Sequence, residues 1–137
     1  MALEFGHGSI DWLSTATVGT NIVINTLTFQ PKAIRFYWTG LQSATDAASQ
    51  AVSERRGVGF AVDTANRRAV GTFSSDAAAT SDCAAVAVND CCVVTLDGTG
   101  AIDGKLDITS FNVDGFQMTV DDQAPASITV FWEAWGD

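Results

Sequence analysis

The sequence contains few residues arranged for catalysis. Its sole histidine, His7, lies between two glycines, and no nucleophile or carboxylate is spaced near it in the pattern of a catalytic triad. The segment RRGVG (55–59) places glycines beside arginines, but it lacks the strand-to-helix context of a phosphate loop. No GxGxxG, Walker or HExxH pattern occurs. We therefore expect a protein that is not an enzyme and that needs no cofactor.

Cysteines are a second source of chemistry, and their number and spacing argue against a metal site. The three thiols of Cys83, Cys91 and Cys92 cannot all pair within one chain, and adjacent cysteines rarely bridge to each other because the geometry is strained. Zinc would need a fourth ligand and better spacing, and the only histidine is far away in sequence. We expect reduced, buried thiols that pack as small apolar side chains.

Aspartates cluster in the segment 96–111, which suggests a calcium loop. It contains two Asp-Gly steps, at 97–98 and 103–104, but their spacing is not that of an EF-hand. Asp-Gly steps suit tight turns that need a positive φ. Asp107 alternates with two aliphatic residues, as a solvent-facing strand residue would. We expect turns here, and no metal ion.

Composition and charge narrow the class of protein. The 137 residues fit one domain, 47% of them are apolar and 17% are charged, which is typical of a folded chain. A net charge of −9 argues against a nucleic-acid partner, because phosphate binding requires clustered basic residues. Residues 1–72 carry six basic against five acidic side chains, whereas residues 73–137 carry one against eleven. This asymmetry can be neutralised within the fold or between identical subunits.

Membrane and secretion signals are missing from the sequence. No run approaches the roughly 18 apolar residues of a membrane helix. The start, MALEFGHGS, lacks the basic and apolar regions of a signal peptide. We expect a protein without a membrane partner that is made in the cytoplasm and either stays there or leaves the cell by lysis.

Short alternating runs separated by turn residues predict an all-β protein. Residues 21–31 and 32–40 are both β-prone, and we expect them to form a strand pair around a short turn. Residues 41–56 are small and polar, which predicts a surface excursion. Four short strands follow, with the sequences VGFAVD, RAVGTF, CAAVAV and CCVVTL. The pattern predicts an antiparallel β-sandwich over 21–137, of jelly-roll or related topology.

The closing run ITVFWEAWG (128–136) predicts a strand with two different faces. Alternation places Ile128, Val130, Trp132 and Ala134 on one face, which suits the core. The other face carries Thr129, Phe131, Glu133 and Trp135, and it is too apolar for open solvent. Burial against another subunit would suit that face.

Three segments resemble small virion proteins encoded by tailed phages and prophages. They are RRGVGFAVDTANRRAVGTFSSDAA (55–78), DGKLDITSFNVDGFQMTVDDQAP (103–125) and ITVFWEAWG (128–136), and the resemblance covers roughly residues 22–136. It implies a β-sandwich that is repeated many times on a particle. It also implies localisation in the virion, after assembly in the host bacterial cytoplasm.

A second pattern is similar to that of H-type lectins. It consists of a strand that ends before proline, a strand that contains Gly-Phe and a closing tryptophan-rich strand, here TLTFQPKAIRFYW (26–38), VDGFQMTV (113–120) and VFWEAWG (130–136). The resemblance implies a lectin-like sandwich, which is commonly trimeric and binds sugars near its last strand. No clear sugar-contact motif accompanies it here.

Two hypotheses follow for the function. In the first, the chain is a capsid decoration or cement protein that binds the major capsid protein and stabilises the head. In the second, it is a carbohydrate-binding receptor domain of a phage tail or fibre. The small size favours the first, because a fibre protein usually carries a long shaft. Other tail or head-completion roles remain alternatives.

Two sets of residues are the candidate contacts. Residues 1–20 are expected to form a docking arm, separate from the sandwich, with Phe5, Ile10 and Trp12 as anchors. The outward face of the last strand is expected to pack against a neighbouring subunit of a homotrimer, where arginines would meet acidic groups such as Glu133. The alternative is that each arginine neutralises acids of its own chain. The arginines concerned are Arg55, Arg56, Arg67 and Arg68.

Overall fold

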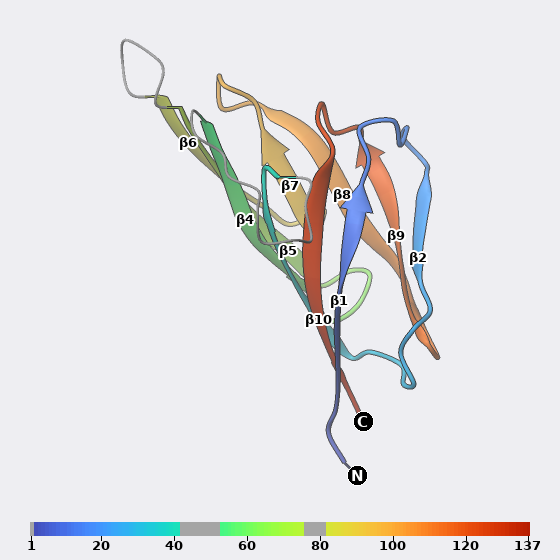
Figure 1. Cartoon of the computed structure of the whole chain (residues 1–137). Coiled ribbons are helices and arrows are strands. Elements are labelled where there is room, and N and C mark those ends of the chain that lie inside the picture. The colour runs from blue at the N-terminus through green and yellow to red at the C-terminus, as the bar shows by residue number, and fades with distance from the viewer. Residues whose placement is uncertain (1, 42–52, 76–81) are drawn as a thin grey trace.

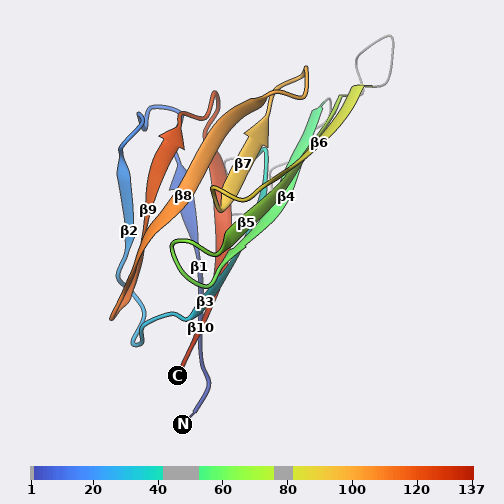
Figure 2. The ribbon, with the colours of Figure 1, turned by 180° about the vertical axis from the view of Figure 1, so that it is seen from behind.

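The chain folds as an antiparallel β-sandwich (Figure 1; Figure 2). The computed structural model describes residues 2–41, 53–75 and 82–137. Within this part of the chain there are strands but no helices, and hence no helix that could cross a membrane. The strands are β1 (Glu4–Trp12), β2 (Asn21–Ile24), β3 (Ala33–Thr39), β4 (Ser53–Ala61), β5 (Arg67–Ser75), β6 (Asp82–Val88), β7 (Val93–Leu96), β8 (Ile102–Asn112), β9 (Gly115–Asp122) and β10 (Ile128–Gly136).

Two sheets form the layers of the sandwich. Sheet A has six strands in the order β1-β10-β3-β4-β5-β6, and sheet B has four in the order β2-β9-β8-β7. The first and last strands of the chain lie side by side in sheet A, and both termini emerge at the same end of the molecule (Figure 1). All strand pairs are antiparallel. The expected all-β sandwich is therefore confirmed.

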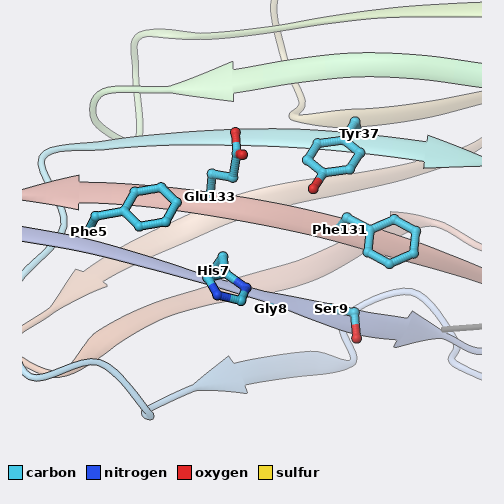
Figure 3. A pocket seen from close by; sticks show the side chains of 7 residues that line it. All are labelled: Phe5, His7, Gly8, Ser9, Tyr37, Phe131 and Glu133. Carbon is cyan, nitrogen blue, oxygen red and sulfur yellow. The ribbon is translucent and has the colours of Figure 1, made fainter. Parts of the chain in front are cut away.

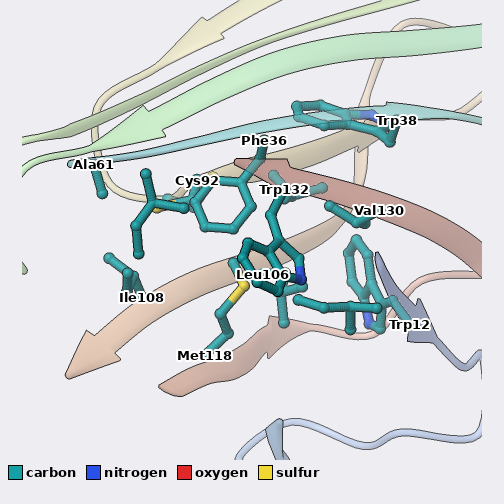
Figure 4. Packing of buried hydrophobic residues seen from close by; sticks show 14 of the residues in the cluster. Trp12, Phe36, Trp38, Ala61, Cys92, Leu106, Ile108, Met118, Val130 and Trp132 are labelled. Atoms are coloured by element: carbon teal, nitrogen blue, oxygen red, sulfur yellow. The ribbon is translucent and has the colours of Figure 1, made fainter. Parts of the chain in front are cut away.

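The core follows from the alternation of side chains along the strands. In β3, Ile34, Phe36 and Trp38 are buried while the residues between them are exposed. In sheet B, Phe116 approaches both Phe36 and Trp132 edge-on, with ring centroids 5.9 and 5.3 Å apart. Figure 4 shows buried apolar side chains of both sheets, among them Phe36, Met118 and Trp132, in the space between the two layers. Edge-to-face contacts of this kind add to the free energy of apolar burial.

Glycines on the inner side of sheet A allow the two layers to approach closely. A Cβ atom on Gly59 would overlap the carbonyl oxygen of Cys92, and one on Gly71 would lie 2.9 Å from the carbonyl oxygen of Val94. Cys92 precedes β7 and Val94 lies in it. Strands β4 and β5 therefore lie almost directly against β7, which explains why all four residues of β7 are buried.

The turns differ in part from the expectation. The Asp114-Gly115 turn joins β8 to β9 and uses a positive φ of 155° at Gly115, as an Asp-Gly step suits. In the 97–101 turn, however, the residue with positive φ (83°) is Gly100 and not Gly98. The expected turn at 103–104 is wrong, because both residues lie inside β8.

The expected pairing of residues 21–31 with 32–40 is also wrong. β2 pairs with β9 in sheet B, whereas β3 lies between β10 and β4 in sheet A. The segment between them crosses from one layer to the other, and Phe29 on this segment is buried. Both strands are short and apolar, so their period could not reveal that they belong to different sheets. Residues 42–52 of the expected surface excursion lie outside the described residues.

The N-terminal segment is part of the sandwich and not a separate arm. Residues 4–12 form β1, which pairs with β10 along its whole length, from Glu4 opposite Gly136 to Trp12 opposite Ile128. Trp12 is fully buried in the core. The apolar residues expected to dock another protein therefore alternate across a strand, and part of them point into the chain's own interior.

Candidate interaction face

The outward side of sheet A is the surface with the most distinctive chemistry, and we call it the outer face of sheet A. In β10, the residues expected to point inward are buried, and Phe131, Glu133 and Trp135 point outward and are half-buried. The expected division of β10 into two faces is therefore confirmed for these residues, whereas Thr129 on the outward side is buried, at 1% exposed. Their partial burial comes from neighbouring strands of the same chain, β1 and β3.

Strand register arranges the outward side chains in rows across the sheet. The central row runs Ser9, Phe131, Tyr37, Val58, Val70, Ala87 from β1 to β6. The row beside it runs His7, Glu133, Arg35, Phe60, Arg68. One row is thus mainly apolar, and its neighbour mixes charged and aromatic side chains. Cross-strand neighbours of this kind are close enough to interact.

Two aromatic pairs border the part of this face that lies over β1, β10 and β3. Phe5 and Trp135 have ring centroids 5.7 Å apart, and Tyr37 and Phe131 are stacked at 5.5 Å with an interplanar angle of 16°. Figure 3 shows the side chains of Phe5, Tyr37 and Phe131 around Glu133, which lies between them along the strands. The aromatic residues of β10 are therefore covered in part by aromatic residues of the same chain.

A polar row lies between the two aromatic pairs. Arg35 forms an ion pair with Glu133, and its guanidinium group also lies 6.0 Å from the ring centroid of Trp135. His7 is opposite Glu133 across β1 and β10, and a groove of about 420 Å³ opens over these residues. Among the described residues, no hydrogen bond joins His7 to Ser9 or to Glu133. The groove offers flat aromatic walls and polar groups that can bind a partner.

Exposed apolar side chains continue this face over β3, β4 and β5. Tyr37 is 40% exposed, Val58 48%, Phe60 49% and Val70 45%. Each of these side chains alternates with a residue that faces the core or is a glycine. Groups of exposed apolar side chains are a common feature of protein interaction sites.

The arginines expected at a subunit interface are divided between two environments. Arg55 lies 3.3 Å from Asp103, and Arg67 lies 2.7 Å from Asp107. Both arginine side chains are largely buried by their own chain, at 20% and 19% exposed, and only that small part could contact a second subunit. Arg56 lies 3.2 Å from Glu54 on the exposed surface. The acidic partners of these three arginines belong to the same chain, as the alternative expectation held.

Arg68 differs from the other arginines. It is exposed on the outer face of sheet A, and its guanidinium group donates to the carbonyl oxygen of Arg67 at 2.7 Å. In the described part of the chain no carboxylate lies within ion-pair distance of it. Arg35, which the sequence argument did not single out, is the arginine that meets Glu133.

An ion pair between Arg67 and Asp107 connects the two sheets. The Nε atom of Arg67 in β5 donates to Asp107 Oδ1 in β8, and its two other guanidinium nitrogens donate to the carbonyl oxygens of Thr64 and Asp90. The hydrogen bond to Asp107 raises the pKa of Arg67. Asp107 is only 7% exposed, so the expectation that it faces solvent is wrong. Its charge is tolerated because it is paired and hydrogen-bonded.

The cysteines lie in two different places. Cys91 and Cys92 are buried next to β7, and burial raises the pKa of the Cys91 thiol to about 12 and also raises that of Cys92. Cys83 is exposed on β6, so the expectation that it is buried is wrong. Across residues 2–41, 53–75 and 82–137, no three His, Cys, Asp or Glu side chains are grouped to hold a metal ion.

The three expected docking anchors are not on one surface. Phe5 is 53% exposed on the outer face of sheet A, whereas Ile10 and Trp12 are 4% and 0% exposed in the core. The docking role of Ile10 and Trp12 is therefore wrong for this fold, because their side chains pack against the chain's own interior. Phe5 instead joins the aromatic pair with Trp135.

Several residues of this face were missed by the sequence argument. Alternation in residues 32–40 already placed Arg35 and Tyr37 on one side of a strand. That signal did not show that β3 pairs with β10, which places Arg35 next to Glu133 and Tyr37 next to Phe131.

No protein-family model, curated protein or solved structure matches the chain.

Proposed function

We propose that this protein is a non-catalytic structural subunit of a phage virion, and specifically a decoration or cement protein that binds the major capsid protein. The observation that carries the proposal is the outer face of sheet A, where Tyr37, Val58, Phe60 and Val70 are each between 40 and 49% exposed. In a chain that acts alone, such a face would promote aggregation. In an assembly it becomes an interface with an apolar centre and a polar rim.

The rest of the fold suits an assembled particle. Sheet A packs closely on sheet B, because β4 and β5 lie against β7 through the glycines described above and the ion pair between Arg67 and Asp107 joins the layers. A preformed face loses little conformational entropy when it binds. The resemblance of residues 55–78, 103–125 and 128–136 to phage virion proteins supports the same role. On a capsid, a small contact repeated many times would add up to a large stabilisation.

Cosedimentation with decoration-free phage heads tests this proposal. We expect the purified chain to pellet with heads, to saturate at a fixed number of copies per capsomer, and to raise the temperature at which the heads release DNA. A β-sandwich of similar net charge serves as the control for non-specific binding. If the chain fails to bind heads and is found instead on isolated tails, the decoration role is wrong.

The groove over β1, β10 and β3 favours a second candidate function, glycan binding. Aromatic rings such as Phe131 and Tyr37 can cover the apolar side of a sugar ring, and Glu133 and His7 can bond to its hydroxyl groups. A glycan array tests this candidate. We expect a bound glycan to be lost in Glu133→Gln and retained in Thr109→Ala, which changes the opposite side of the molecule. The absence of any bound glycan would remove this candidate.

A further inference from the structure

We propose that the partner of the outer face of sheet A is a second copy of this chain, stacked face to face about a twofold axis that runs parallel to the strands between β3 and β4. This inference rests on the assembly role proposed above and names the partner of the same face. It replaces the expected homotrimer by an isologous dimer, in which the same surface of both copies forms the contact.

The charged row supports this axis. From β1 to β5 its residues are His7, Glu133, Arg35, Phe60 and Arg68. A twofold axis between β3 and β4 places each residue opposite the one equally far from the midline. Glu133 then faces Arg68 of the second copy, and Arg35 faces the ring of Phe60. A carboxylate meets an arginine and a guanidinium meets an aromatic ring, both favourable contacts.

The same axis between β3 and β4 also brings complementary side chains opposite each other in the central row. Its residues from β1 to β6 are Ser9, Phe131, Tyr37, Val58, Val70 and Ala87. Tyr37 then faces Val58 of the second copy, and Phe131 faces Val70. Every large side chain of the row meets an apolar one, so the centre of the contact is apolar while charges lie to one side.

The third row adds no repulsion. On β3, β4 and β5 it contains Thr39, Arg56 and Thr72, and the axis places Thr39 opposite Arg56 of the second copy. Like charges therefore face each other in none of the three rows. A twofold axis across the strands would lack the contact between Glu133 and Arg68, because it places the charged row opposite the threonine row.

Arg68 is the residue whose charge this dimer would neutralise. It is exposed and its charge meets no carboxylate among the described residues of its own chain. Glu133 is 22% exposed, and Arg35 engages its Oε2 atom. Among the described residues no hydrogen bond engages the other oxygen, Oε1, which can therefore accept from a guanidinium group of a second copy. Two symmetric contacts of this kind would form in the dimer.

Sedimentation equilibrium of the purified chain tests the dimer without any capsid. We expect a dimer at micromolar concentration. Arg68→Glu should raise the dissociation constant about tenfold or more, because it faces Glu133 of the second copy with a like charge. Arg56→Glu is the matched control, since it makes the same charge change on the same face opposite a threonine, and it should have a much smaller effect. Adding Glu133→Gln to Arg68→Glu should recover part of the loss.

Cross-linking tests the direction of the axis, in a Cys83→Ser background. Val70→Cys with Phe131→Cys should be joined between chains by a bis-maleimide that spans two facing sheets about 10 Å apart. Within one chain the same two positions are separated by three strand spacings, about 14 Å. Val70→Cys alone should not be cross-linked. Efficient cross-linking of that single variant would place Val70 opposite itself and overturn the axis.

The remaining outcomes separate this inference from the proposed function. A wild-type chain that is monomeric or trimeric at micromolar concentration overturns the dimer. If that chain still binds phage heads, the proposed function stands without it. A dimer that binds neither heads nor tails would support the inference and contradict the decoration role. Circular dichroism of each variant confirms that the changes act on association and not on folding.

Discussion

The outward sides of the two sheets differ in how many apolar side chains they expose: sheet A has several in its centre, whereas sheet B has Val23 beside a group of polar side chains. On sheet A, the exposed side chains in the centre are Val58, Phe60 and Val70. On sheet B, polar side chains bond to one another across the strands. Thr109 lies 3.1 Å from Thr119, and Thr119 donates to the side-chain oxygen of Asn21 at 2.7 Å.

This comparison shows which side of the sandwich would gain more from contact with a partner. The polar groups of sheet B satisfy one another and remain open to water, so that face is stable as it stands. Covering the apolar side chains of sheet A with another surface would remove them from water, which is favourable. The proposed assembly contact is therefore placed on sheet A.

The largest expected effect comes from the inner side of sheet A. Gly59→Ala places a Cβ atom against the carbonyl oxygen of Cys92, and backbone cannot move aside as a flexible side chain can. We expect the free energy of unfolding to fall by more than about 3 kcal/mol in urea titrations, at the upper end of overpacking costs. Gly98→Ala is the control, because its nearest neighbour, Phe73, would be 3.7 Å away. Equal stability of both variants would mean that the layers are not held this closely.

The second effect concerns the link between the sheets. Arg67→Met leaves the carboxylate of Asp107 buried without its guanidinium partner, and we expect a loss of about 3 kcal/mol in the free energy of unfolding. Lys105→Met is the control, because its partner Asp90 is 57% exposed and surface pairs contribute under about 1 kcal/mol. Similar losses of unfolding free energy in both variants would show that the buried Arg67–Asp107 ion pair contributes no more to stability than a surface pair.

The third effect compares a turn of each sheet. Asp63 follows β4 and accepts hydrogen bonds from the Asn66 side chain and from two backbone amides, and Asp97 follows β7 and accepts from the side chain and backbone of Thr99. These bonds lower the pKa of both carboxyl groups below the ordinary 3.8. The stability that they add is complete above that value and is lost as the pH falls through the lower folded-state pKa.

Asp63→Asn and Asp97→Asn should therefore lower the melting temperature near pH 7, and the difference from wild type should shrink near pH 2. Thermal unfolding followed by circular dichroism at both pH values measures it. A difference that grows in acid would reverse the sign of the argument.

The smallest effect on stability is expected on the two outward sides themselves. Val70→Thr on sheet A and Thr109→Val on sheet B should each change the free energy of unfolding by less than about 0.5 kcal/mol. Their retention on a hydrophobic-interaction column should move in opposite directions, earlier for Val70→Thr and later for Thr109→Val. The comparison between the sheets would be weakened if Val70→Thr left retention unchanged.

Parts of the fold and the face could be predicted because they depend on local period. Alternation in the last strand assigned Trp132 to the core and Glu133 to the outside, and both assignments are confirmed. The same argument failed for Asp107. Alternation shows that its side chain points away from the face of Leu106 and Ile108, but it does not show whether another part of the chain covers the opposite face. Here Arg67 covers it, from a strand in the opposite sheet.

The sequence by itself determined that the chain is all-β and which residues share a strand face, because side-chain period is a local property. Only the tertiary structure decided that β1 joins the sandwich and that β2 and β3 belong to different sheets. It also decided that His7, Glu133, Arg35, Phe60 and Arg68 form one row. Such pairings join residues far apart in the chain, and they depend on how all the strands pack together, which no short segment encodes.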